Sequence, residues 1–308
     1  MNVQNPSASR GIAIQAIDLV KNYGTGSNMV HALRGVNVSF ERGKFTAIMG
    51  PSGSGKSTLM HTLAGLDSAT SGHILFGGAD LTRMNHKQLT LLRRHKIGFI
   101  FQSFNLLPMF TAEQNILMPL TLAGDKPDRA WFDLLVETLG LKQRLNHRPN
   151  ELSGGQQQRV AIARALITKP KLVFADEPTG NLDSVSSAEV LGFLKRSVNE
   201  LGQTIVMVTH DAVAASYADR AIVFSDGRIV ADEQHPNAEV MNELLMAERE
   251  RTTRTTLTDT PADQMAQMAG VRNVPDLPIT DAPLPPAVPT SGCEGTLRHA
   301  RAAARHAR

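Results

Sequence analysis

The stretch KFTAIMGPSGSGKST, Lys44 to Thr58, decides the fold of this chain. Its first residues are mostly apolar, as in a buried strand, and the run STLMHTLAGL at its end has the pattern of a helix. Between the two, the spacing G-x-x-x-x-G-K-S is that of a phosphate-binding loop, the P-loop. Glycines let consecutive backbone N–H groups point inward, and the helix adds its positive N-terminal dipole. We therefore expect a site for a nucleoside triphosphate at the end of a strand.

The loop also assigns tasks to individual side chains. Lys56 is expected to reach the β- and γ-phosphates, and Ser57 is expected to offer its hydroxyl to Mg²⁺. A surface loop rich in Gly and Ser is the alternative, and the position of Lys and Ser beside a buried strand argues against it. The pattern does not choose among kinases, GTPases and ATPases. The expected phosphate-binding residues are Gly50, Pro51, Ser52, Gly53, Ser54, Gly55, Lys56, Ser57 and Thr58.

An acidic doublet narrows the choice among kinases, GTPases and ATPases, because it disfavours a kinase. In KLVFADEPTGNLD, the mostly apolar run from Leu172 to Ala175 is followed by Asp176 and Glu177. A buried strand that ends in an acid places that acid at the carboxyl edge of the sheet, beside the P-loop. We expect Asp176 to hold Mg²⁺ through its water shell, and Glu177 to act as general base or to position the attacking water. Asp-Glu-Pro is also good turn chemistry, but a turn alone is the weaker interpretation beside a P-loop.

The sequence contains no N-K-x-D stretch of the kind that recognises guanine, which disfavours a GTPase. Tyr23, one of two tyrosines, lies in the segment VKNYGTG between a strand and a loop. An aromatic ring there can stack on a purine without contacting its edge. A loop aromatic with no ligand is an equally open interpretation from these residues alone.

Short apolar runs alternate with helical patterns from Ile12 to Glu248, which predicts an α/β domain with a mainly parallel sheet. The early stretches IAIQAIDLV and VNVSFERGK alternate as half-exposed strands do and predict a small antiparallel sheet. Residues from about 103 to 168 have helical periodicity, which predicts an inserted helical subdomain. Residues 249–308 are rich in Thr, Pro and Ala, have few large apolar residues and end in a basic run, so we expect a disordered tail.

Composition restricts the class of protein further. A formal net charge of +3 does not indicate nucleic acid by itself. The single cysteine, Cys293, rules out an internal disulfide. The start has no pattern of a secretory signal, and no apolar run reaches the roughly 18 residues of a membrane-spanning helix. We therefore expect a chain that does not cross a membrane by itself.

The stretch LSGGQQQR, Leu152 to Arg159, resembles an anion site without a catalytic group. Ser153 is a favourable N-cap residue, and the free N–H groups at the start of the following helix suit a phosphate. A cap needs only Ser153, whereas Gly154 and Gly155 also remove side chains from the approach. The sequence thus contains a second candidate phosphate site.

In this order, the motifs resemble those of the ATP-binding subunit of an ABC transporter, over about Ile12 to Glu248. GPSGSGKST resembles Walker A, FIFQSFNLLP the Q-loop, LSGGQQQR the signature, LVFADE Walker B, GNLDS the D-loop and VTHD the switch. The resemblance implies a P-loop NTPase core of the RecA-like type that binds ATP and Mg²⁺, with Tyr23 stacked on adenine. It also implies that Gln102 contacts the metal and the attacking water, that His210 contacts the γ-phosphate, and that Asp183 lies at a dimer interface.

In this family, two ATP-binding subunits pack head to tail around two ATP molecules. Each ATP lies between the P-loop of one copy and the signature of the other, so ATP binding closes the dimer and hydrolysis releases it. The resemblance therefore implies a second copy of this chain as partner. The residues that would contact the ATP of the other copy are Ser153, Gly154, Gly155 and Gln156.

The segment FNLLPMFTAEQNILMPL, Phe104 to Leu120, has many apolar residues for a loop that contains Pro108, which suggests a docking surface. The resemblance implies that a separate integral membrane permease docks there. The segment and DEPTGNLDS are most similar to the branch with MacB, LolD and FtsE, whose members export peptides, antibiotics or lipoproteins or transmit force across the membrane. Where that branch often has Glu-Asn, this chain has Gln114-Asn115, and we expect little effect on hydrolysis and some effect on docking.

This resemblance also implies a location on the cytoplasmic face of the cell membrane, as a peripheral subunit held by the permease. The alternative is an ATP-switched regulatory or nucleic-acid-associated ABC ATPase without a permease. Nucleic-acid-associated members have a long inserted coiled coil or two cassettes in one chain. Neither feature occurs in this sequence, so no nucleic-acid partner is expected.

Overall fold

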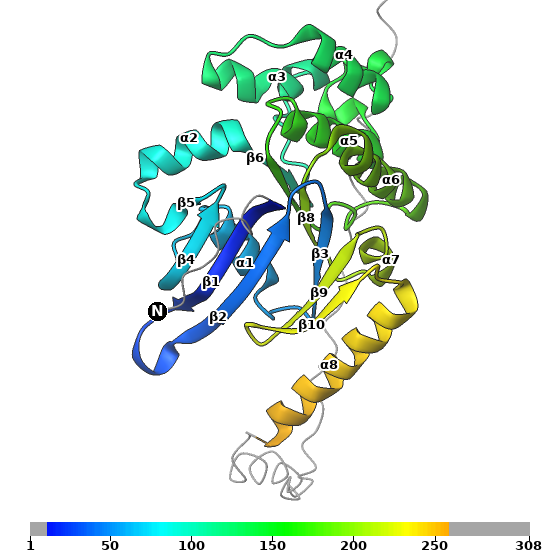
Figure 1. The fold of residues 1–308 in the computed structure, drawn as a ribbon. Coiled ribbons are helices and arrows are strands. Elements are labelled where there is room, and N and C mark those ends of the chain that lie inside the picture. The colour runs from blue at the N-terminus through cyan, green and yellow to red at the C-terminus, as the bar shows by residue number, and fades with distance from the viewer. Residues whose placement is uncertain (1–10, 259–308) are drawn as a thin grey trace, which may run out of the picture. The chain divides into compact units, whose positions relative to one another are not determined.

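A six-stranded sheet forms the centre of the computed structural model, which describes residues 11–258 (Figure 1). The strand order is β10-β9-β3-β8-β7-β6, and all neighbours are parallel except β10, which runs antiparallel to β9. The strands are β3 (Phe45–Met49), β6 (Ile97–Phe101), β7 (Leu172–Asp176), β8 (Ile205–Val208), β9 (Arg220–Ser225) and β10 (Arg228–Gln234). Strands β3 and β8 are buried at every position, which explains their continuous apolar sequences. The predicted mainly parallel core is confirmed.

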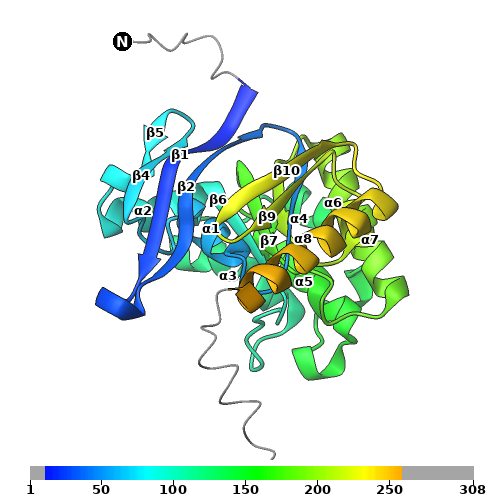
Figure 2. The ribbon, with the colours of Figure 1, turned by 90° about the horizontal axis from the view of Figure 1, so that it is seen from below.

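A second, antiparallel sheet packs beside the first and has the order β2-β1-β4-β5. Its strands are β1 (Ile12–Tyr23), β2 (Val30–Glu41), β4 (Ser71–Phe76) and β5 (Ala79–Asp80). Figure 2 shows the long strands β1 and β2 side by side. Helix α1 (Lys56–Leu63) joins the two sheets, since its Leu59 and Leu63 belong to one buried cluster with Ile14 of β1 and Phe174 of β7. The predicted small antiparallel sheet is confirmed.

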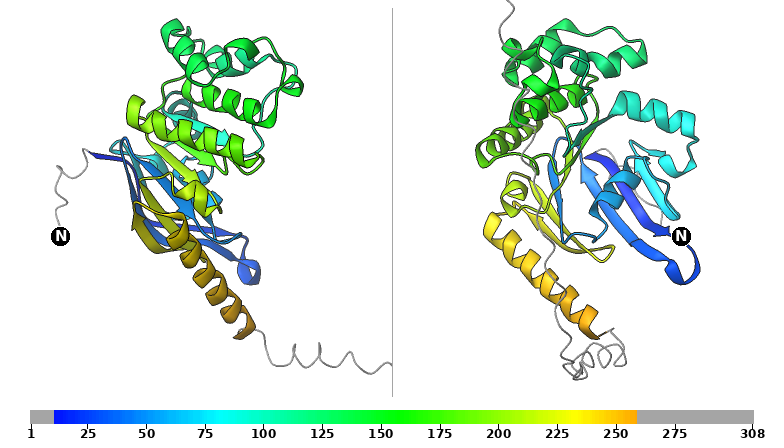
Figure 3. Two further views of the ribbon diagram at one scale, coloured as in Figure 1. Left: turned by 90° about the vertical axis from the view of Figure 1, so that its right-hand side faces the viewer. Right: turned by 180° about the vertical axis from the view of Figure 1, so that it is seen from behind.

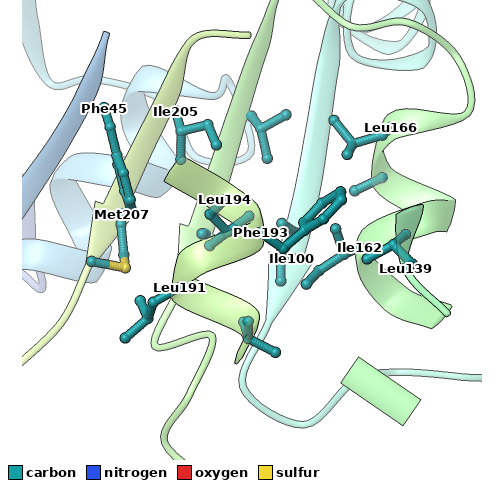
Figure 4. Close-up of a cluster of buried hydrophobic side chains, with 14 of the residues drawn as sticks. Phe45, Ile100, Leu139, Ile162, Leu166, Leu191, Phe193, Leu194, Ile205 and Met207 are labelled. Atoms are coloured by element: carbon teal, nitrogen blue, oxygen red, sulfur yellow. The ribbon is translucent and has the colours of Figure 1, made fainter. Parts of the chain in front are cut away.

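Three helices follow β6 where the sequence predicted them: α3 (Ala112–Ala123), α4 (Arg129–Thr138) and α5 (Gly154–Leu166). Short 3-10 turns, η4 (Lys142–Arg144) and η5 (Pro149–Glu151), lie between α4 and α5. Each helix begins after a side chain that accepts a backbone hydrogen bond: Thr111, Asp128 and Ser153. The cluster in Figure 4 joins this helical part to the sheet through contacts among Ile100, Leu139, Ile162 and Leu166.

The remaining helical elements are η2 (Gly26–Asn28), η3 (Leu81–Arg83), α2 (His86–Lys96), α6 (Ser184–Leu201), α7 (Ala212–Ala215) and α8 (Ala238–Thr258). Figure 3 shows α8 from two further sides. No helix within residues 11–258 combines the length and hydrophobicity that a membrane span requires.

The predicted start of a disordered tail at residue 249 is wrong, because α8 continues through Thr258. The helix is anchored at its start by Met241 and Leu245, which are buried in the core. No Gly or Pro occurs between Ala238 and Thr258, so the helix propagates beyond the apolar residues that anchor it. The remainder of the predicted tail, residues 259–308 with its basic end, lies outside the described residues.

Candidate functional site

The P-loop connects β3 to α1, as predicted, and two of its glycines are required by the packing of the chain. Gly50 and Gly55 have φ angles of 149° and 103°. A Cβ at Gly50 would lie 1.9 Å from the carbonyl oxygen of Phe224, and one at Gly55 would lie 2.4 Å from that of Ala32. Neither position can hold a side chain unless the backbone moves. Glycine is thus dictated here by backbone conformation and by neighbouring strands, in addition to any ligand.

A cavity of about 690 Å³ lies beside the loop, lined by Gly53–Thr58 and, on another side, by Tyr23, His31 and Arg34. Lys56 is buried, and its Nζ donates a hydrogen bond to the carbonyl of Pro51 at 2.7 Å. Burial lowers the pKa of Lys56, although the nearby carboxylates Glu177 and Asp176 act in the opposite direction. An ammonium in such surroundings gains from an anion placed beside it.

Of the other loop residues, Ser52 is exposed and Ser54 is buried. The Oγ of Ser54 has no hydrogen-bond partner among residues 11–258. The loop therefore contains a buried polar atom that the described protein does not satisfy.

Two of the three residues predicted to hold the metal meet across the sheet edge. The hydroxyl of Ser57 donates to Oδ1 of Asp176 at 3.4 Å. Burial raises the pKa of Asp176, against the opposing effect of His61, whose Nε2 lies 3.9 Å from Oδ2. His61 occurs in the helix after the P-loop, and no sequence motif marks it as a site residue.

Glu177 and His210, which follow different strands, also meet. His210 Nδ1 lies 2.9 Å from Glu177 Oε2, and both residues line one cavity of about 630 Å³. Glu177 has a φ of 45°, and its backbone N–H donates to the carbonyl of Val208 at 2.9 Å. The Glu177 backbone is therefore held in an unusual conformation directly after β7, where a carboxylate was predicted to face water.

Gln102 reaches the same edge of the sheet, because its neighbour Phe101 pairs with Asp176. Its side chain lies against Gly180, where an added Cβ would be 2.7 Å from Nε2. The Gln102 carbonyl accepts a hydrogen bond from Asn181 at 3.0 Å. The structure thus places Gln102 beside the segment that follows Glu177.

The signature lies at the start of α5 and does not line the cavity at the P-loop. Ser153 and Gln156 cap the helix reciprocally, with bonds of 3.3 Å from Gln156 N to Ser153 Oγ and 3.0 Å from Ser153 N to Gln156 Oε1. A Cβ at Gly155 would lie 2.8 Å from Ser186 Oγ, and one at Gly154 would lie 3.6 Å from a methyl carbon of Leu182. Gly155 therefore also lets α5 pack closely on the start of α6, a role that no sequence motif indicates, whereas a Cβ at Gly154 would make only an ordinary contact.

Asp183 is the N-cap of α6, and it accepts hydrogen bonds from Ser186 N at 2.9 Å and Ser186 Oγ at 2.7 Å. The backbone and hydroxyl hydrogen bonds from Ser186 lower the pKa of Asp183. The D-loop and the signature thus meet through Ser186, which touches Gly155 and Asp183.

Known proteins share this arrangement of motifs. The sequence profile described as "ABC transporter" matches residues 33–180. The chain is 49% identical over 221 residues to the lipoprotein-releasing system ATP-binding protein LolD of Geobacter metallireducens, which covers 71% of this chain and 98% of that protein. The chain belongs to the ABC transporter family. It is an ATP-binding subunit of the ABC ATPase type, as predicted.

Further relatives confirm the predicted branch. The macrolide export ATP-binding/permease protein MacB of Syntrophobacter fumaroxidans is 49% identical over 220 residues, 70% of this chain but 31% of MacB. This chain therefore spans about a third of that relative's length. A dimeric structure of the ATP-binding cassette MJ0796, in a post-hydrolysis state bound to ADP and Pi, has a TM-score of 0.66 and 39% identity, and covers 73% of this chain and 99% of that one.

Proposed function

We propose that two copies of this chain bind two ATP molecules with Mg²⁺, hydrolyse them and thereby drive a separate membrane permease of the MacB type. The observation that carries this proposal is the convergence of Lys56, the Ser57–Asp176 pair and the Glu177–His210 pair at the carboxyl edge of one sheet. These side chains come from three separate strand ends and match the needs of phosphoryl transfer to water.

The donor set fits Mg²⁺, which prefers a few protein oxygens together with waters and phosphate oxygens. Ser57 and Asp176 would hold it, with Gln102 as a further ligand from the adjacent strand end. Within residues 11–258 no group of three or more His, Cys, Asp or Glu side chains forms a candidate metal site. When bound, the ion would neutralise charge on the phosphates.

The remaining side chains bind the nucleotide or act on the attacking water. Lys56 binds the β- and γ-phosphates, and Tyr23 stacks on adenine at the other end of the same cavity. Glu177 orients the attacking water and accepts its proton, and His210, 2.9 Å from Glu177, contacts the γ-phosphate and holds the water from the other side.

The dimer follows from the separation of the signature from the P-loop. Ser153, Gly154, Gly155 and Gln156 do not line the cavity at the P-loop of their own chain, so contact with a γ-phosphate requires a second copy. The similarity to the dimeric MJ0796 cassette supports this arrangement. Asp183, beside the signature through Ser186, would lie at the same interface.

A groove of about 470 Å³ beside the segment Phe104–Leu120 is the proposed docking site for the permease. Its apolar lining includes Phe99, Phe101, Met118, Pro119 and Leu122. Exposed apolar surface of this kind marks an interaction site. The permease would hold the chain on the cytoplasmic face of the membrane, and the process would be export or transmission of force.

The loop beneath this groove is held by a buried arginine of α5. Arg164 is 8% exposed and donates to the carbonyls of Phe104 at 2.7 Å and Asn105 at 2.5 Å. Both of these residues have positive φ angles, of 56° and 49°. Gln114 and Thr111 cap α3 reciprocally, in the geometry that a Glu at position 114 would also give. This supports the expectation that Gln in place of Glu has little effect on hydrolysis.

The test is Glu177→Gln in the full chain, because the amide keeps the shape but cannot accept a proton. We expect ATP binding to persist, ATP hydrolysis to be nearly abolished and an ATP-dependent dimer to accumulate in light scattering. The matched control is Glu189→Gln, which alters an exposed carboxylate 3.6 Å from Arg159. Normal turnover in Glu177→Gln would remove Glu177 from this role.

A further inference from the structure

Two side chains outside all the motifs hold the ring of Tyr23. Its hydroxyl donates to Oδ2 of Asp67 at 2.5 Å. The Nζ of Lys21 lies 4.7 Å from the centre of the ring and donates to Oδ1 of Asp67 at 2.7 Å. Lys21, Tyr23 and Asp67, which we call the Tyr23 clamp, therefore contact one another.

The clamp is charged and partly removed from water. Lys21 is only 7% exposed and also donates to the carbonyl of Ser68 at 2.8 Å. Burial tends to raise the pKa of Asp67, but the hydrogen bonds from Lys21 and Tyr23 outweigh it, and the pKa is lowered. Both carboxylate oxygens of Asp67 accept hydrogen bonds: Oδ2 from Tyr23, and Oδ1 from Lys21 and from the N–H of Ser68. A buried ion pair usually adds little net stability. The Lys21–Asp67 pair is notable because both of its members contact the ring or the hydroxyl of Tyr23.

The ring is covered on one side by a cation, and the residue keeps exposed surface at the cavity. The ammonium of Lys21 lies over one face, and Tyr23 as a whole is still 43% exposed on the rim of the cavity at the P-loop. The bond to Asp67 fixes the hydroxyl end, so the ring cannot turn freely. A planar ligand in the cavity therefore meets a ring that is already oriented.

The clamp is also tied to the phosphate site through α1. Asp67 follows the C-terminal end of α1, and its backbone N–H donates to the carbonyl of His61 in that helix. The same helix begins at Lys56 in the P-loop. One short helix thus relates the phosphate-binding loop to the carboxylate that holds the ring.

We propose that Asp67 and Lys21 are positioning residues that orient Tyr23 for stacking on the purine base of the nucleotide. This inference rests on the proposed function, which places ATP in that cavity. Pre-orienting one side chain avoids the cost of ordering it on binding, which corresponds to about a 3- to 10-fold gain in affinity. This gain in affinity applies only to ligands that carry the purine base and not to ligands that consist of phosphates alone.

The experiment is calorimetric titration of the full chain with two ligands, the non-hydrolysable Mg²⁺ adenylyl imidodiphosphate and Mg²⁺ tripolyphosphate, which lacks the base. We expect Asp67→Asn and Lys21→Met each to weaken binding of the adenylyl ligand about 3- to 10-fold, with tripolyphosphate binding changed less than about 2-fold. In a Tyr23→Phe background, Asp67→Asn should add little, because the hydroxyl it serves is gone. Asp80→Asn, which alters an acid bonded to His73 in the antiparallel sheet, is the control and should change neither ligand.

Three outcomes would overturn the inference: an equal loss for both ligands, fully additive effects in the Tyr23→Phe background, or no loss in both Asp67→Asn and Lys21→Met. If the unaltered chain binds neither ligand, the proposed function itself fails. If it binds both ligands normally and the clamp variants behave like the control, only the role of Asp67 and Lys21 fails.

Discussion

Asn115→Ala should be among the most destabilising single changes outside the nucleotide site. Asn115 is fully buried in α3 and accepts from the N–H of Leu107 at 2.8 Å. Its amide nitrogen donates to the carbonyls of Leu107 at 3.1 Å, Phe110 at 3.2 Å and Thr111 at 3.0 Å. One side chain therefore ties the loop from 107 to 111 to α3 through four hydrogen bonds.

The magnitude follows from what alanine leaves behind. A buried polar group without a partner costs about 1–3 kcal/mol, and the substitution removes the partner of the Leu107 N–H and of the Phe110 carbonyl. The carbonyls of Leu107 and Thr111 keep the backbone N–H groups of Phe110 and Asn115. Since the loop can relax and admit water, we expect a total loss of about 2–4 kcal/mol in the free energy of unfolding. In a domain of this size that corresponds to a fall of about 6–12 °C in the melting temperature.

Differential scanning calorimetry at neutral pH is the appropriate assay, with Asn150→Ala as the matched control. Asn150 is exposed, and no hydrogen bond of its side chain occurs among residues 11–258, so its replacement should shift the melting temperature by less than about 1 °C. A fall of less than about 2 °C for Asn115→Ala would refute the reasoning, because the loop would then not depend on this side chain.

Lys56→Ala should weaken ATP binding itself by about 10- to 100-fold in a direct titration, because a charged hydrogen-bond donor to phosphate is lost; unchanged affinity would contradict its placement on the phosphates. Ser153→Arg should leave ATP binding by the monomer intact while abolishing dimer formation and hydrolysis, and loss of monomer binding would count against the proposed dimer. Burial alone would raise the pKa of Asp219, but hydrogen bonds from Lys195 and from the backbone N–H of Phe45 lower it. Because the pKa of Asp219 is lower in the folded state, its ionised form stabilises the protein above the unfolded pKa of about 4, and this stability is lost as the pH falls through the folded pKa. The melting temperature of Asp219→Asn should therefore fall less steeply from pH 7 to pH 3 than that of the unaltered chain.

Much of the site was predictable because its residues follow local rules. The P-loop, the acid doublet at the end of β7 and the caps at Thr111 and Ser153 each depend on neighbours within a few residues in the sequence. Strands β3 and β8 are apolar throughout because both of their faces are buried.

The features that the sequence did not reveal depend on distant contacts or lack a pattern. His61 and Asp176 come together across more than a hundred residues, and so do Gly50 and the Phe224 carbonyl that excludes its side chain. Helix α2 has no buried residue, so its sequence has no strong apolar face. Strand β10 alternates in exposure, but its sequence RIVADEQ does not alternate between apolar and polar residues. The continuation of α8 past its last buried residue has the same cause.

The hydrogen bonds from Arg164 to the carbonyls of Phe104 and Asn105 connect helix α5 to the loop beneath the groove. Arg164 is eleven residues beyond Ser153 on the same helix, a span of about 17 Å at the usual rise per residue. Helix α5 therefore has the Ser153 cap at one end and, near its other end, the arginine that holds the positive-φ residues Phe104 and Asn105. A tilt of about 5° pivoting at either end would displace the opposite end by about 1.5 Å. If the proposed function holds, phosphate binding at the Ser153 end and permease docking at the Arg164 end would be linked through this one helix.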